Sequence, residues 1–140
     1  ISSRMNMEEF PKYKDLVLNA INTLLLRPIN DNNSITYDNA CSSYGKVILT
    51  HFTNNTDIDN LTINYLKMLP LKNCLIESEK TAMNLMRMLE AGNPILLRDN
   101  VLPEVKEAIK RINEFRVAEG EILKDEGVAL MMLIKNKLQI

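Results

Sequence analysis

The sequence predicts an all-α protein in which antiparallel helix pairs stack side by side into an alpha-alpha superhelix. Apolar residues recur at helical spacing in every long segment, and no segment alternates like a half-buried strand. Hydrophobic residues make up 46% of the chain but aromatic residues only 5%, so Leu, Ile and Met must fill the interior. Ala40 aligns with Ala82 and Leu61 with Val105, offsets of about 42–44 residues, and HEAT and armadillo repeats have periods of roughly 40–47 residues. We therefore expect a solenoid of the HEAT type.

Six helices are expected after an N-terminal tail over residues 1–12. Their approximate positions are residues 13–26, 34–52, 57–69, 77–91, 101–124 and 125–138. Because the chain begins with Ile1 and not with Met, we expect a fragment of a longer protein. The first residues of the tail are candidates for vector-derived sequence.

The first two expected helices carry broad apolar faces. Pro28 ends the first, because proline cannot continue a helix. The stretch 31–34 supplies N-cap candidates for the second. Early in the second helix, Asp38 and Asn39 form a polar pair. We assign both residues structural roles: Asp38 favours the positive end of the helix, and Asn39 bonds backbone of a neighbouring loop or helix.

Proline and glycine mark the ends of the third and fourth helices. Pro70 follows the apolar stripe of the third helix and ends it. Gly92 has the type and the place of a helix C-cap residue, since glycine readily adopts the left-handed conformation found there. Pro94 follows it as a stop.

The fifth helix opens with Pro103, which fits the first turn because the N–H groups there have no partner within the helix. Its apolar row can be extended through Ile122, so we expect this helix to pass Gly120 and stop near Lys124. A break at Gly120 is the alternative. Asp125 is a candidate cap of the sixth helix.

Gly45 and Lys46 raise the question of a phosphate-binding loop. Such a loop needs an earlier glycine, where Ala40 stands, and Ser or Thr after the lysine, where Val47 stands. Both requirements fail, so we interpret this stretch as part of an amphipathic helix.

The remaining composition excludes several classes of function. The net charge of −1 gives no electrostatic footprint for nucleic acid or an anionic membrane. The longest apolar run, 128–134, is far shorter than the roughly 20 residues of a membrane span. Cys41, Cys74 and the single His51 cannot form a zinc cluster or a nucleophile–base pair at a recognisable spacing. We therefore expect no catalytic, cofactor or metal residues, no enzyme activity, and a reducing intracellular setting.

An ordered set of motifs resembles a known family. The stretches are "ITYDNACSSYGKVIL", "YLKMLPLKNCLIESEKTAMNLMRMLEAGNPILL" and "NVLPEVKEAI". In this order and spacing they resemble the C-terminal HEAT repeats of the importin-beta (karyopherin-beta) family, most of all the karyopherin beta 3 branch. The similarity covers about Tyr13 to Phe115. The turn "KNCLIESEK" departs from the family, because it lacks the strongly acidic run usual there.

The resemblance implies a fragment of a nuclear import receptor that shuttles between cytoplasm and nucleus through the nuclear envelope. Its partners would be cargo proteins and Phe-Gly nucleoporins, with Ran bound by other repeats of the full-length protein. The second helix of each pair would line the concave side, which gives five interaction candidates: Glu104, Glu107, Lys110, Arg111 and Glu114. A HEAT scaffold outside transport, of the phosphatase or chromosome-organising type, is the alternative, and a helical-bundle enzyme ranks third.

Overall fold

The computed structural model describes residues 10–26, 34–54, 56–120 and 122–140, with the backbone alone at residues 10–15 and 51. Over these ranges the chain forms six α-helices and no strand, so the all-α prediction is confirmed there. The helices are α1 (Phe10–Leu25), α2 (Ser34–His51), α3 (Ile58–Lys67), α4 (Leu75–Glu90), α5 (Leu102–Ala118) and α6 (Asp125–Leu138). Pro28 and residues 31–33 lie outside the described ranges.

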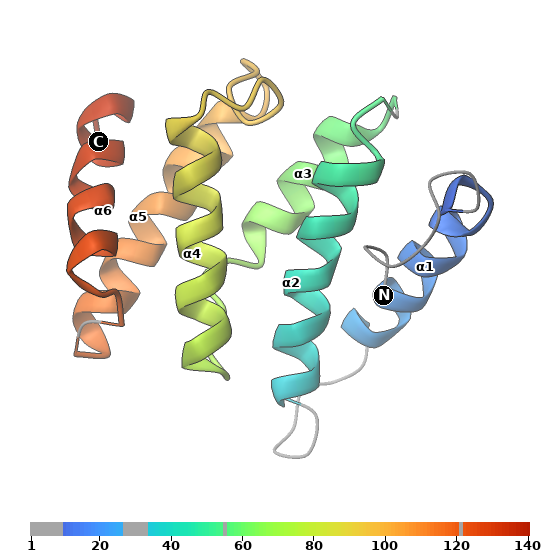
Figure 1. Ribbon diagram of the computed structural model, residues 1–140, viewed down its shortest axis with the longest axis horizontal. Coiled ribbons are helices and arrows are strands. Elements are labelled where there is room, and N and C mark those ends of the chain that lie inside the picture. The colour runs from blue at the N-terminus through green and yellow to red at the C-terminus, as the bar shows by residue number, and fades with distance from the viewer. Residues whose placement is uncertain (1–9, 27–33, 55, 121) are drawn as a thin grey trace.

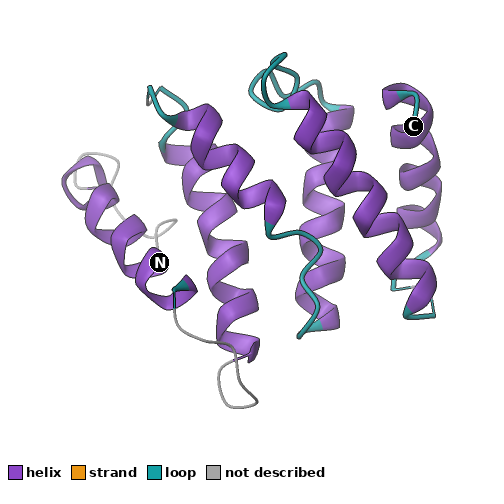
Figure 2. Ribbon diagram, turned by 180° about the vertical axis from the view of Figure 1, so that it is seen from behind, coloured by secondary structure: helices purple, strands orange, loops and turns teal. Residues whose placement is uncertain are grey.

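The helices are arranged in two layers (Figures 1 and 2). Helices α2, α4 and α6 lie side by side and run in one direction, whereas α3 and α5 lie behind them and run in the opposite direction. Helix α1 packs on α2 at one end of the row. Because successive helices are antiparallel, short connections are sufficient to join them.

The core lies between the two layers. Its fully buried side chains come from every helix from α2 to α6, and they include Leu66, Leu85, Met86, Ile109 and Ile134. These are the apolar stripes that the sequence predicts, so each helix buries its stripe only by packing on its neighbours.

Equivalent positions of the predicted repeat occupy equivalent places in adjacent helices. Ala40 of α2 and Ala82 of α4 are both buried, as are Tyr44 and Met86, which follow them by one turn. The offset of 42 residues therefore matches a step from one helix to its neighbour in the same layer.

Two boundary predictions are wrong. Helix α1 begins at Phe10, inside the stretch 1–12 predicted as a tail. Helix α5 ends at Ala118 instead of continuing to Lys124, because Gly120 has a positive φ of 82° that a right-handed helix cannot contain. The alternative break at Gly120 is the one observed.

The predicted helix ends at glycine and proline residues agree with the structure. Gly92 has φ 76° and directly follows α4, and the N–H of Asn93 donates to the carbonyl of Met88, which completes a Schellman motif. Pro94 comes next, in a turn where the Asn93 side-chain oxygen accepts from two backbone N–H groups. Pro70 follows α3, and Pro103 lies in the first turn of α5.

A buried carboxylate joins α2 to the start of α4. Asp38 is 1% exposed, and it accepts hydrogen bonds from the backbone N–H groups of Asn73 and Cys74, both at 2.8 Å, and from the Asn73 amide at 3.0 Å. These donors stand at the positive end of α4, which favours an anion. The prediction for Asp38 was therefore wrong in one detail, because its carboxylate binds at the start of the following helix of its layer and not at the start of its own helix. Asn39 is exposed, and its bond to neighbouring backbone stays a prediction.

Replacing the Asp38 carboxylate should destabilise the fold. In Asp38→Ala the two backbone donors lose a buried acceptor, so the free energy of unfolding should fall by roughly 2–3 kcal/mol. Urea denaturation followed by circular dichroism measures this. The control, Asn39→Ala, changes the adjacent exposed residue and should stay within about 0.5 kcal/mol of the parent. Equal effects of the two changes would contradict the role of Asp38.

Candidate functional site

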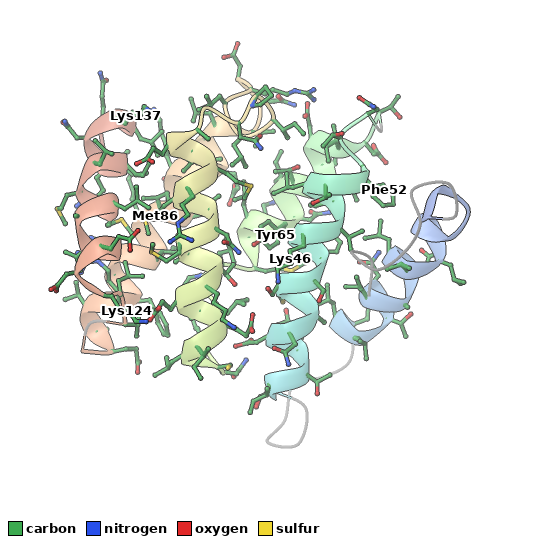
Figure 3. All side chains as sticks on the ribbon, in the orientation of Figure 1. Lys46, Phe52, Tyr65, Met86, Lys124 and Lys137 are labelled. Carbon is green, nitrogen blue, oxygen red and sulfur yellow. The ribbon has the colours of Figure 1, made fainter. Side chains whose placement is uncertain are left out.

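A groove opens between α2 and α4 on the face seen in Figure 3, with a volume of about 390 Å³. Helix α2 forms one wall, helix α4 the other, and the Tyr65 ring of α3 forms part of the floor. We call it the α2–α4 groove. Its lining residues are Ser42, Gly45, Lys46, Leu49, Thr50, Tyr65, Thr81, Asn84, Arg87, Met88 and Ala91.

The middle of the groove is fixed by a close contact between Gly45 and Tyr65. A Cβ atom at Gly45 would overlap the Tyr65 ring, so glycine lets α3 approach α2 closely. The ring is 4% exposed, and burial, with a smaller effect of Cys41, raises the pKa of the Tyr65 phenol. The Gly45-Lys46 pair is therefore a packing feature of a helix, as the sequence predicts, and not a phosphate loop.

The rim of the groove is cationic. Lys46 is exposed on α2, and Figure 3 shows it beside Tyr65 in the space between α2 and α4. Arg87 stands on the opposite wall and forms an ion pair with Glu126 at 3.7 Å. Because both side chains of that pair are more than half exposed, the pair contributes little stability and leaves Arg87 accessible to a ligand.

The polar groups of the α2–α4 groove are suited to binding a peptide. Thr50 and Asn84 offer donors and acceptors on opposite walls, and Leu49 and Met88 supply apolar surface between them. A peptide needs this combination: apolar surface for one side chain and a few polar groups for its backbone.

Chemistry-bearing clusters are not seen in the part of the chain that the structure describes. No three His, Cys, Asp or Glu side chains come together there in a way that could hold a metal ion. None of the described helices is long and apolar enough to cross a membrane. Cys41 is buried and Cys74 half-buried, and neither forms a disulfide. The His51 side chain lies outside the described residues.

The five interaction candidates of α5 divide into two groups. Arg111 has a structural role: its Nε donates to the carbonyl of Leu69 at 3.0 Å and its Nη2 to that of Leu66 at 2.9 Å, which satisfies the C-terminal end of α3. It also forms an ion pair with Glu104 at 3.8 Å. The Arg111 side chain is nevertheless 37% exposed, so its assignment as a contact residue stays a prediction.

The other candidates remain at the surface. Lys110 pairs with Glu107 at 3.6 Å within α5, and both are about half exposed. Glu114 is exposed and borders a shallow hollow beside Pro70. The structure does not bring these residues together with the α2–α4 groove, because α5 belongs to the other layer.

Sequence reasoning missed the groove residues. The available signal was Gly45, since a glycine in the middle of a helix is costly and usually has a packing reason. The partner of that glycine, Tyr65, stands on another helix, and no local pattern in the sequence connects the two. Comparisons of the chain with protein-family models, with curated proteins and with solved structures find no match.

Gly45→Ala should destabilise the protein, although Gly→Ala in a helix normally stabilises it by about 1 kcal/mol. The added methyl group overlaps the Tyr65 ring, so the free energy of unfolding should fall by about 1–3 kcal/mol. Chemical denaturation measures it, with Ser43→Ala, at an exposed site of the same helix, as the control. A gain in stability for Gly45→Ala would show that the two helices are not in close contact.

The two cysteines should differ in reactivity. Burial raises the pKa of the Cys41 thiol to about 11, so at pH 8 roughly one molecule in a thousand carries the thiolate that reacts. An Ellman assay of the native protein at pH 8 should therefore titrate one thiol per chain, that of the half-buried Cys74, and a second only in denaturant. Rapid reaction of both native thiols would contradict the burial of Cys41.

Proposed function

We propose that this chain is a protein-binding segment of a nuclear import receptor of the karyopherin-beta family. The observation that carries the proposal is the α2–α4 groove, an apolar groove between two neighbouring helices that occupy equivalent positions of the predicted repeat. The motifs of the sequence resemble the C-terminal repeats of that family, and the two-layer arrangement is compatible with such repeats.

We further propose that the helices are HEAT-type repeats of a solenoid, with α2 and α3 as one pair and α4 and α5 as the next. Support comes from the side-by-side packing of α2 on α4 and of α3 on α5, with matching buried positions such as Ala40 and Ala82. In a solenoid each pair contacts only its neighbours, so the stack can bend, and a partner selects the curvature that it binds best.

In this proposal the α2–α4 groove accepts a single large apolar side chain from an extended peptide. The side chain would rest on the apolar surface of Leu49, Tyr65 and Met88, and Thr50 and Asn84 would bond the peptide backbone. The Phe residue of a Phe-Gly nucleoporin segment has the required size, and its glycine lets the backbone lie close to the helices. Binding of one Phe-Gly segment in one groove would be weak. Many Phe-Gly segments along one nucleoporin would together raise the overall affinity.

Cargo would bind to other surfaces of the full-length receptor, and Ran would act through other repeats. The segment would accompany the receptor between cytoplasm and nucleus. Its role is to recognise and hold partners, and it contributes no bond-making step.

Binding of Phe-Gly segments tests the proposal. A ¹⁵N-labelled sample titrated with a Phe-Gly peptide should show NMR shift changes at the amides of Gly45, Lys46 and Asn84, and a Ser-Gly peptide should not produce them. Thr50→Trp fills the groove from an exposed position of α2 and should weaken binding about tenfold or more.

The matched control is Ser43→Trp, which adds the same side chain to α2 outside the groove and should leave binding unchanged. Thermal unfolding of both variants verifies that the fold is retained. Equal binding by the two variants would remove the groove from the proposal. Binding of a phosphatase catalytic subunit, without any response to Phe-Gly, would replace transport by a scaffold function.

A further inference from the structure

Helices α4 and α6 finish at the same end of the molecule (Figure 1). A second groove lies there, separate from the α2–α4 groove except that both adjoin α4. Its volume is about 400 Å³. We call it the α4–α6 groove and define it by the side chains that the argument uses: Leu89, Leu97, Lys106, Ile134, Lys137 and Leu138.

The interior of the α4–α6 groove is apolar. Leu89 and Ile134 belong to the core and lie beneath the groove, 2% and 0% exposed, and Leu138 beside them is 8% exposed. Leu97, in the turn between α4 and α5, is 41% exposed although it lies beside them. At Gly92 an added Cβ would meet no atom within 4 Å, so this wall is open to a ligand.

The wall that carries Leu97 is anchored. The next residue, Arg98, binds Asp59 of α3 at 2.6 Å, and Asn100 binds the other oxygen of the same carboxylate at 2.7 Å. The turn is thereby tied to another helix pair, and the groove is a formed surface to which an extended segment can bind without first ordering the turn.

Among the described residues, both charged groups that line the groove are lysines, Lys106 of α5 and Lys137 of α6. Neither forms an ion pair with a described residue; Lys137 has only a long contact of 3.4 Å to the carbonyl of Glu90. No acidic residue stands three or four positions away from either lysine on its own helix. Figure 3 shows Lys137 at the end of α6, where its ammonium can reach a ligand.

We propose that the α4–α6 groove binds an acidic segment of a partner protein in which one large apolar side chain is flanked by carboxylates. The apolar side chain would rest on Leu97 and Leu138, above the buried Leu89 and Ile134, and carboxylates on either side of it would pair with Lys106 and Lys137. Because exposed ion pairs are weak, the apolar anchor would supply most of the affinity, and the lysines would select acidic over basic sequences.

A second copy of the chain is a poorer fit through the exposed apolar residues of its α6. Met132 and Leu133 of α6 are about half exposed, but Lys135 and Lys137 follow them, so another α6 would bring positive charge to a positive rim. The exposed Ile76, which precedes Glu77, is the segment of this chain closest to the required chemistry, and self-association is therefore an outcome of the test.

Fluorescence anisotropy with labelled heptapeptides provides the test. The probe is Gly-Glu-Glu-Phe-Glu-Glu-Gly, compared with one peptide in which Ser replaces Phe and another in which Lys replaces every Glu. The parent protein should bind the probe, and each altered peptide should bind about tenfold more weakly or less. Equal binding of the Phe and Ser peptides would overturn the proposal, as would failure of the probe to bind.

Charge reversal in the protein locates the site. Lys106→Glu/Lys137→Glu should weaken binding of the probe about tenfold, whereas Lys67→Glu/Lys72→Glu makes the same change in net charge at exposed positions elsewhere and should stay within about twofold. Thr50→Trp, which fills the other groove, should leave binding of the acidic probe unchanged. Failure of the acidic-segment proposal can therefore be distinguished from failure of the Phe-Gly proposal. An equal loss of probe binding in both double variants would overturn the inference. Self-association of the protein that is abolished by Lys137→Glu and also by Ile76→Asp would overturn it too, because a second copy would then occupy the groove.

Discussion

The buried carboxylate of Asp38 is the interaction on which the arrangement of α2 and α4 depends. A single side chain satisfies two backbone donors at the start of α4 and so fixes where the second helix of the layer begins relative to the first. Near the middle of the helices, Gly45 sets the depth at which the Tyr65 ring lies beneath them. Once the start of α4 and the depth of the Tyr65 ring are fixed, the apolar stripes of α2 and α4 pack in register. The space that remains between these two helices is the α2–α4 groove.

Similar polar ties recur along the chain. Asp38 reaches Asn73, 35 residues away; Asp59 reaches Arg98, 39 residues away; and Arg111 reaches back to Leu69, 42 residues away. Each tie connects a helix to the next pair along the stack. Apolar packing alone tolerates sliding of one helix on another, whereas hydrogen bonds to a buried carboxylate or to the carbonyls of a helix end are directional and fix the register. The core therefore provides cohesion, and the polar ties fix relative positions.

Much of this could be predicted from the sequence, because helical periodicity and end signals are local. The stripe of α4, the positive φ of Gly92 and the place of Pro103 follow from neighbouring residues. The prediction that α5 continues past Gly120 was wrong, although Ile122 extends its apolar row. The adjacent Leu123 is buried, but it lies in the connection to α6 and not in α5. The roles of Asp38 and Arg111, and the whole α2–α4 groove, depend on residues brought together from different helices, for which one sequence contains no pattern.

The contact between Gly45 and Tyr65 also provides an optical signal. The chain has four tyrosines and no tryptophan, so its near-ultraviolet absorption comes chiefly from phenol rings. Tyr65 is buried, its phenol has a raised pKa, and its ring lies where the two layers meet at the floor of a groove. Its absorption should respond when the layers separate or when a ligand covers the ring. The protein thus contains its own chromophore for following movement between the two layers, without any attached dye.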